Sequence, residues 1–306
     1  MWPPPAPLAA EAELVSTVSA RVRAADLREL LKPGITIFVV VSAAAGYLLG
    51  TTTHVDWVAL LGLLVGTGLT AGGAGALNHL AERRPDALMR RTQDRPLPAG
   101  RIRPGFVLGY GLACVAAGLV ALGLTTNALT TVLALVSVVL YVCVYTPLKR
   151  RTVLNTFVGA VPGALPALGG YTAATGDIGG VGLAVFGILF LWQLPHFYAL
   201  AWMLREDYAR GGFVMLPSRA NGEKATAAVS LAAALLLLVA GVLPGAMGAA
   251  GWAYLAGMAM LGTAFTLPAF SFFAGPNDRR ARRLLLASII YVPAFFGLVV
   301  LDALLR

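Results

Sequence analysis

Long apolar runs separated by short polar segments are the main pattern along this chain. Each run holds about 20 mainly apolar residues, enough to cross ~30 Å of hydrocarbon as a helix. The runs are continuous rather than alternating, so they predict transmembrane helices and exclude an outer-membrane β-barrel. We expect nine such helices, at residues 34–51, 57–81, 106–124, 128–147, 155–173, 181–204, 225–245, 251–274 and 284–303.

Composition supports an all-α integral membrane protein. Of the 306 residues, 58% are apolar and only 12% are charged, whereas about 25% of a soluble protein's residues are charged. This share of charge is too small to cover a water-exposed surface, and so many apolar residues exclude a disordered chain. We therefore expect an N-terminal segment at residues 1–33 and one domain of nine transmembrane helices at residues 34–304.

The basic residues are confined to alternate connections between the predicted helices. The net charge is +9, and 22 of the 23 Lys and Arg residues lie before the first helix or after the second, fourth, sixth and eighth. By the positive-inside rule these connections are cytoplasmic, so the N-terminus is expected in the cytoplasm and the C-terminus outside. This placement indicates a membrane protein rather than a nucleic-acid-binding one. The cytoplasmic connections after the second and sixth helices are long and polar, where a site is expected.

Three oxygen-bearing side chains follow the second apolar run at helical spacing. Asn78, Glu82 and Asp86 are four residues apart, so a continuing helix places them on one face. Such a set suits Mg²⁺, which takes a few carboxylates and leaves its other positions to substrate phosphates. The alternative is a helix end whose acidic residues pair with nearby arginines. Pro85 also disfavours helix just before it, so Asp86 either extends this helix or starts a new turn.

Basic residues suited to a diphosphate stand in two of the cytoplasmic connections. Lys149 and Arg150 follow the fourth run, and Arg95 lies in the connection after the second. Arginine binds phosphate bidentately and lysine acts as a point charge. The alternative for Lys149 and Arg150 is positive-inside bias alone.

The fifth and sixth runs carry features that a lipid-facing helix does not need. Pro162 and Pro166 interrupt the fifth run, and the carbonyls they free require a cavity or neighbouring helices. Gln193 and His196 lie within the sixth run, and polar residues at such depth are by default functional. The alternative for His196 is a core histidine whose hydrogen bonds are satisfied. Glu206 and Asp207 follow nearer the membrane surface.

Taken together, these strings resemble the UbiA superfamily of intramembrane prenyltransferases and, within it, the protohaem IX farnesyltransferase family. The motifs that carry the resemblance lie between about residues 30 and 220, and the last three helices carry little of it. Two departures are Glu82, where the family has Asp, and Pro85, where it more often has an apolar helix former. The motifs are Leu31–Pro33, Asn78–Asp86, Arg91–Thr92, Arg95–Pro98, Tyr145–Arg150, Asn155–Thr156, Gly159 with Pro162–Gly163, Trp192–Phe197, Asp207–Tyr208 and Met215–Pro217.

The resemblance implies a UbiA-type bundle that transfers a farnesyl group from farnesyl diphosphate to a vinyl group of haem B, with water addition, giving haem O. It implies Mg²⁺ as cofactor, a place in the plasma membrane, and a haem A synthase and a terminal oxidase as downstream partners. The implied metal ligands are Asn78, Glu82 and Asp86 on one side and Glu206 and Asp207 on the other. The implied diphosphate contacts are Arg91, Arg95, Lys149 and Arg150. The implied haem or prenyl contacts are Tyr145, Asn155, Trp192, Gln193, His196 and Phe197, and the catalytic set is Asn78, Glu82, Asp86, Lys149, His196 and Asp207.

Two alternatives differ in function. A UbiA-type enzyme could prenylate a quinone precursor or a lipid, but such relatives have acidic residues where His196 stands. A non-catalytic transporter would be supported by an inverted internal repeat, which we do not find.

Overall fold

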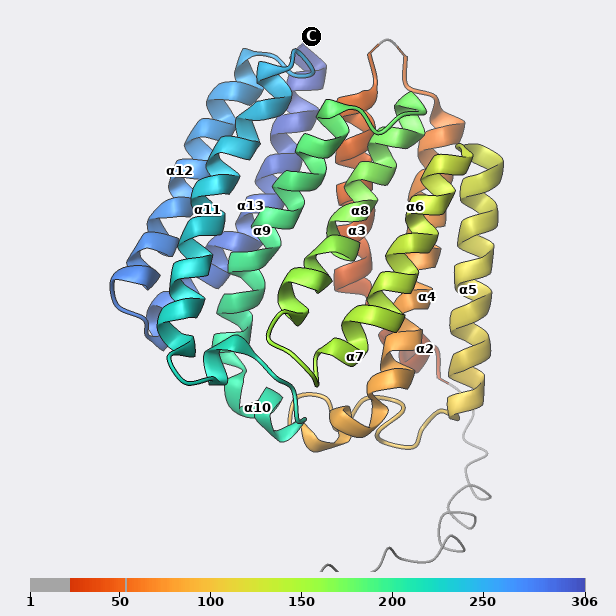
Figure 1. Ribbon diagram of the computed structural model, residues 1–306. Helices are drawn as coiled ribbons and strands as arrows, with labels where there is room; N and C mark the ends of the chain where they lie inside the picture. The colour runs from red at the N-terminus through yellow and green to blue at the C-terminus, as the bar shows by residue number, and fades with distance from the viewer. Residues whose placement is uncertain (1–22, 53, 306) are drawn as a thin grey trace, which may run out of the picture.

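A computed structural model describes residues 23–52 and 54–305 of the chain, so the first 22 residues of the predicted N-terminal segment lie outside the described residues. Within these ranges the protein is a bundle of long helices, drawn upright in Figure 1. In chain order the elements are α2 (Ala24–Leu30), α3 (Pro33–Gly50), α4 (Trp57–Leu88), α5 (Pro104–Thr125), α6 (Ala128–Val139), the π-helical turn η1 (Leu140–Tyr145), α7 (Thr146–Leu148), α8 (Asn155–Thr175), α9 (Gly180–Met203), α10 (Arg205–Arg210), the short 3₁₀ turn η2 (Leu216–Ser218), α11 (Gly222–Ala246), α12 (Trp252–Ala274) and α13 (Asp278–Leu305).

A long helix lies at each predicted position, and most ends agree to within three residues. In the described part of the chain, eight of these helices are long and apolar enough to cross a membrane. The exception is α8, whose prolines, glycines and polar residues lower its hydropathy. The number of nine spans therefore stays a prediction. Figure 1 shows α8 inside the bundle, alongside α3, α6 and α9.

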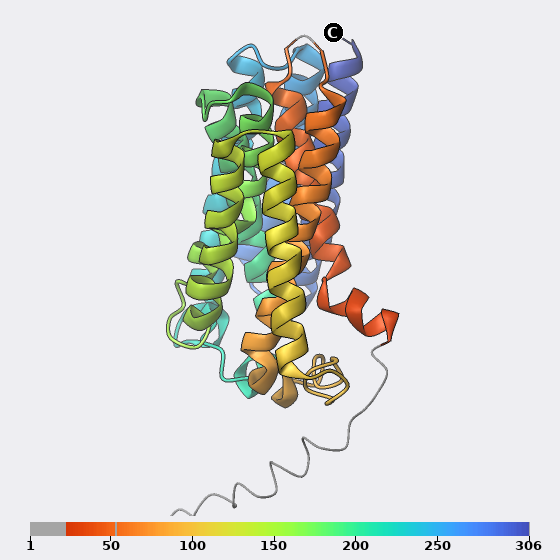
Figure 2. The same cartoon turned by 90° about the vertical axis from the view of Figure 1, so that its right-hand side faces the viewer.

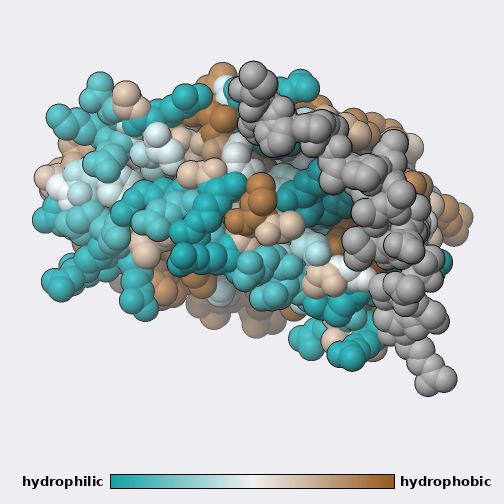
Figure 3. Space-filling model, turned by 90° about the horizontal axis from the view of Figure 1, so that it is seen from below, coloured by the Kyte–Doolittle hydropathy of each residue, from teal (hydrophilic) through white to brown (hydrophobic). Residues whose placement is uncertain are grey.

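The basic connections gather at one end of the bundle, drawn at the bottom of Figure 1. The long connection between α4 and α5 lies there with α7 and α10, and α2 lies beside the same end (Figure 2). Seen from below, hydrophilic residues cover most of this face (Figure 3). An ion pair of 2.8 Å between Arg101 and Asp26 holds α2 against the α4–α5 connection. This end is therefore a polar surface built on an apolar bundle.

Glycines allow two helix pairs to pack backbone against backbone. A Cβ atom at Gly46 of α3 would lie 1.9 Å from the carbonyl oxygen of Ala167 in α8, and one at Gly170 of α8 would lie 1.9 Å from that of Ala43 in α3. Between α4 and α5 a Cβ at Gly73 would lie 2.7 Å from a backbone oxygen. Small residues at helix interfaces permit this approach, which compensates for the lack of a hydrophobic driving force in lipid.

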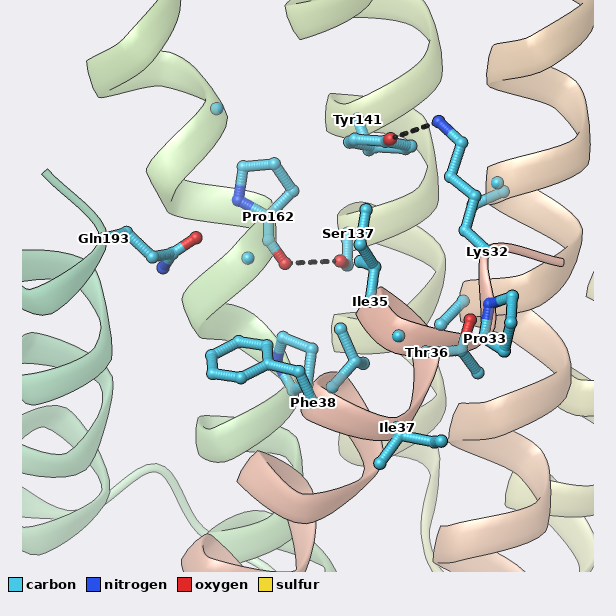
Figure 4. A pocket seen from close by; sticks show the side chains of 18 of the residues that line it. Lys32, Pro33, Ile35, Thr36, Ile37, Phe38, Ser137, Tyr141, Pro162 and Gln193 are labelled. Atoms are coloured by element: carbon cyan, nitrogen blue, oxygen red, sulfur yellow. Dashed lines mark hydrogen bonds between the residues drawn. The ribbon is translucent and has the colours of Figure 1, made fainter. Parts of the chain in front are cut away.

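One of the carbonyls freed by the prolines of α8 finds a partner on a neighbouring helix, as predicted. Pro166 has no N–H to offer the carbonyl of Pro162, one turn earlier. The hydroxyl of Ser137 on α6 donates to that carbonyl at 2.8 Å (Figure 4). The side-chain amide of Gln193 on α9 donates to the carbonyl of Ala160 at 3.2 Å. Helix α8 is thus an internal wall held by polar contacts from both sides.

Candidate active site

A large cavity runs from the polar end into the bundle, with a volume of about 1240 Å³. Known ligand pockets are commonly about 300–1,000 Å³, so this one has room for two substrates. Its walls come from the start of α3 and from α4, α6, α8, α9 and α13. Figure 4 shows Lys32, Phe38, Tyr141 and Gln193 around part of it.

The three oxygen-bearing side chains of α4 lie on one buried face, as their spacing predicts. Asn78, Glu82 and Asp86 have exposed fractions of 0%, 6% and 1%. Helix α4 continues through Pro85 to Leu88, so Asp86 extends the helix and does not start a new turn. Glu82 and Asp86 line the cavity, while Asn78 lies behind its wall.

Each carboxylate of this face is paired with one of the predicted phosphate-binding cations. Lys149 Nζ lies 2.7 Å from Glu82 Oε1, and an Arg95 guanidinium nitrogen lies 2.8 Å from Asp86 Oδ2. Burial lowers the pKa of Lys149, but Tyr145 and the Glu82 carboxylate outweigh it, so that the pKa is raised and the ammonium stays charged. In the described structure, Asp86 Oδ1 is buried without a hydrogen-bond partner. Asp86 lines the cavity, so this side chain has one carboxylate oxygen left to accept a cation.

Lys32 completes this polar end and has no role among the residues predicted from the sequence. It stands between α2 and α3 in the left-handed region, with φ 49°, a conformation that costs free energy in a non-glycine residue. Its ammonium donates to Asn78 Oδ1 and, at 3.4 Å, to the hydroxyl of Tyr141. Burial lowers the pKa of Lys32 to about 7, against the opposing effect of Glu82. Its sequence signal was a place in the motif Leu31–Pro33, directly before an apolar run.

A π-helical turn helps to place Lys149. Residues Leu140–Tyr145 form η1, which continues directly into α7. Single π-helical turns are found frequently at functional sites. Tyr141, Tyr145 and Lys149 all line the cavity, and the Lys149 ammonium lies 4.6 Å from the centre of the Tyr145 ring. The predicted substrate contact Tyr145 is therefore positioned beside the predicted diphosphate contact.

The deeper part of the cavity is aromatic. Trp192, Gln193, His196 and Phe197 of α9, which are predicted substrate contacts, line it. The rings of Trp192 and His196 stack with centres 5.0 Å apart, and Phe38 of α3 also stacks on Trp192, at 4.9 Å. These flat apolar surfaces suit a large planar ligand.

His79 is a further wall residue that the sequence analysis did not assign. It is 2% exposed and lines the cavity. Neither ring nitrogen has a hydrogen-bond partner in the described structure. Its position next to Asn78, on the helix that carries the carboxylates, was the only sequence signal.

Glu206 and Asp207 of α10 lie near this end but do not line the cavity. Both Asp207 oxygens accept backbone N–H groups at the end of α4, from Arg90 at 2.9 Å and Arg91 at 3.2 Å. Burial raises the pKa of Asp207, but these two hydrogen bonds and nearby arginines outweigh it and lower the pKa. The Glu206 side chain is 81% exposed. In the described structure no three His, Cys, Asp or Glu side chains form a group able to hold a metal ion.

The remaining predicted residues divide between the cavity and the loops around it. Arg91 and Arg95 line the cavity, whereas Arg150 is exposed and does not. Asn155 is buried outside the cavity, where its amide donates to the carbonyls of Thr152 at 2.6 Å and Val214 at 2.8 Å. Asn155 therefore fastens the loop after α7 to the segment after α10.

The comparisons with known proteins all point to one family. A model of the UbiA prenyltransferase family matches residues 39–297. The chain is similar to a protoheme IX farnesyltransferase of Salinibacter ruber, with 50% identity over 90% of this chain and 98% of the relative. It is 43% identical to a protein of the same name from Anaeromyxobacter sp., over 94% of this chain and 99% of that one.

Solved structures of similar fold include a digeranylgeranylglyceryl phosphate synthase, with a TM-score of 0.77, 17% identity, and coverage of 92% of this chain and 98% of that one. A UbiA homolog from Archaeoglobus fulgidus bound to DMAPP and Mg²⁺ has a TM-score of 0.69 and 17% identity, over 90% of this chain and 99% of that one. At these identities the structures establish a shared fold.

Proposed function

The chain belongs to the UbiA prenyltransferase family, and from that membership we propose that it is a protohaem IX farnesyltransferase. It is a multi-pass membrane protein that transfers a farnesyl group from farnesyl diphosphate to a vinyl group of haem B, giving haem O and diphosphate. Relatives of 50% and 43% identity over nearly their whole length carry that name. We infer the same substrates for this chain.

The observation that carries this function is the continuity of the cavity. A mouth lined by Glu82, Asp86, Arg95 and Lys149 opens into the aromatic chamber around His196 without a separating wall. A prenyl diphosphate has a polyanionic head and an apolar tail, so this cavity matches both ends. The polar head stays at the bundle end while the tail and the acceptor lie among apolar side chains.

The cationic side chains that line the cavity bind the diphosphate. Arg91, Arg95 and Lys149 supply charge-assisted hydrogen bonds, which are about twice as strong as neutral ones. Arg150 adds charge at the surface of the same end. These groups stabilise the negative charge that develops on the diphosphate as its bond to the farnesyl C1 breaks.

The residues of α4 fit a divalent cation. The partnerless Asp86 Oδ1 and the neighbouring Glu82 carboxylate are hard oxygen donors of the kind that Mg²⁺ prefers. We propose Asn78, Glu82 and Asp86 as ligands, with Glu206 and Asp207 of α10 as the other half of the site. When bound, Mg²⁺ neutralises charge on the leaving diphosphate as a Lewis acid. The ammonium groups of Lys32 and Lys149, which contact Asn78 and Glu82, also hold this face together.

The proposed reaction proceeds through carbocations, which the cavity must protect from bulk water. The C1–O bond breaks with its electron pair leaving on the diphosphate, and C1 gains allylic cation character. The vinyl π-bond of haem attacks C1, water adds to the resulting cation beside the porphyrin, and one proton is released. The apolar walls protect the first cation from bulk water. His196 and Trp192 orient the porphyrin.

We further propose nine transmembrane spans, with α8 as the least apolar. The polar end is cytoplasmic and the C-terminus outside, in the plasma membrane. The distribution of basic residues supports this orientation. A haem A synthase and a terminal oxidase are the proposed users of the product.

The test uses purified protein in detergent with haem B, farnesyl diphosphate and Mg²⁺, and detects pigments by chromatography with mass detection. We expect haem O, lost with a chelator and restored by Mg²⁺. Glu82→Gln abolishes it, while Asp177→Asn, an exposed carboxylate at the other end, does not. If an aromatic compound is prenylated and haem is not, the prenyl-transfer reaction stands but haem is not the acceptor. No product from any acceptor would overturn the enzymatic function.

A further inference from the structure

The ring of His196 is held from a different helix, by Ser288 of α13. His196 Nδ1 lies 2.8 Å from Ser288 Oγ. The same hydroxyl donates its only proton to the carbonyl of Leu285, at 2.6 Å. A hydroxyl has one proton and two acceptor lone pairs, so toward His196 it acts as the acceptor. Nδ1 therefore carries the imidazole proton, and Nε2 carries a lone pair.

Ser288 also holds the ring that stacks on His196. The indole N–H of Trp192 donates to the backbone carbonyl of Ser288 at 2.8 Å. Trp192 in turn covers one face of the His196 ring, with an angle of 21° between the two planes. One residue of α13 thus fixes the orientation of two neighbouring rings of α9.

Ser288 acts only through these neighbours. Its exposed fraction is 0%, and it does not line the cavity. His196 does line the cavity, as do Ile289 and Pro293 on the same side of α13. Since Nδ1 is occupied by Ser288, Nε2 is the ring nitrogen available to a ligand.

We propose that Ser288 is a positioning residue that keeps His196 in the Nδ1-protonated form, so that Nε2 binds the iron of the porphyrin substrate as an axial ligand. A metal-bound histidine commonly donates its other ring N–H to a neighbouring acceptor, which fixes the tautomer and makes the ligand more basic. This inference rests on the proposed function, because it takes haem as the acceptor.

The experiment compares haem B with iron-free protoporphyrin IX, titrated into the purified full-length protein. Loss of the group that holds a metal-binding histidine weakens metal binding by about 10–100-fold. Ser288→Ala should therefore weaken haem binding by at least about tenfold and shift the haem absorption band. Binding of protoporphyrin should stay within about twofold, because no iron is involved. Ser288→Thr, which keeps the hydroxyl, should retain wild-type haem binding.

The control is Ser230→Ala on α11, whose buried hydroxyl donates only to its own helix at Thr226; both titrations should be unchanged. If Ser288→Ala weakens the binding of haem and of protoporphyrin equally, or weakens neither, the proposed role of Ser288 is overturned. If Ser288→Ala does not fold, His196→Ala decides by the same two titrations. Haem O formation by the wild type is measured on the same preparation. If the wild type forms no haem O while Ser288→Ala selectively loses haem binding, the proposed reaction is rejected but His196 remains the proposed iron ligand.

Discussion

Gly163 of α8 has no side chain because Gln193 of α9 occupies that space. A Cβ atom at Gly163 would lie 2.0 Å from Gln193 Oε1, whereas ordinary contacts begin near 3.4 Å. In Gly163→Ala the amide of Gln193 must therefore move by about 1.4 Å, the difference between these two distances. A long flexible side chain can make this movement, so we expect the variant to fold.

The expected defect is catalytic. Gln193 lines the cavity and donates to the carbonyls of Ala160 and Leu189. Loss of one such neutral hydrogen bond costs about 0.5–1.5 kcal/mol of stability. A displacement of about 1 Å at a substrate contact can lower turnover by about 100-fold. We expect haem O formation to fall by at least about tenfold, with little change in the temperature of unfolding.

The assay is steady-state haem O formation by Gly163→Ala, Gln193→Ala and the double variant, with thermal unfolding of each. If displacement of the amide is the cause, the double variant should be no less active than Gln193→Ala alone. Gly169→Ala is the matched control, because a Cβ there meets nothing within 4 Å although Gly169 also lines the cavity. Wild-type activity of Gly163→Ala, or additive losses in the double variant, would refute this reasoning.

Three further predictions follow from the same geometry. Lys149→Met should lower turnover at least about tenfold through loss of the proposed charged hydrogen bond to diphosphate, whereas Arg150→Met should change turnover by less than about twofold. Equal losses in the two variants would contradict the proposed role of Lys149. Asp86→Asn should lower turnover about 100-fold by removing a charged oxygen from the proposed cation site, and unchanged Mg²⁺ dependence would count against it. Gly170→Ala should lower the unfolding temperature by about 2 °C or more, through a backbone clash between α3 and α8. Gly169→Ala should leave that temperature unchanged, and equal shifts would reject the packing argument.

The helices and one half of the site were predictable because each depends on local spacing. Apolar runs of fixed length give the helices, and a spacing of four residues places Glu82 and Asp86 together whatever surrounds them. The paired prolines of α8 predicted unsatisfied carbonyls, and Ser137 supplies the donor for that of Pro162. Local periodicity was sufficient for these features.

The remaining contacts depend on which helices become neighbours. Ser288 is a single serine in an apolar run, 92 residues from His196, and nothing in its sequence context separates it from Ser230. Lys32 reaches Asn78 only because the backbone turns sharply between α2 and α3. The role of Asp207 as an acceptor for two backbone amides requires α10 to meet the end of α4.

The π-helical turn η1 has a consequence for how this helix tolerates length changes. A π-helical turn is equivalent to one extra residue inserted into an α-helix, and each residue of an α-helix turns the chain by about 100°. Deletion of one residue within Leu140–Tyr145 would restore a regular α-helix of nearly the same length and hydropathy. Because the wide turn absorbs the extra residue, Lys149 would keep nearly its present orientation relative to α6; a regular α-helix without the deletion would instead rotate it by about 100°. Loss of one residue should therefore be tolerated better within this turn than elsewhere in the same helix, although the segment reads as ordinary apolar helix.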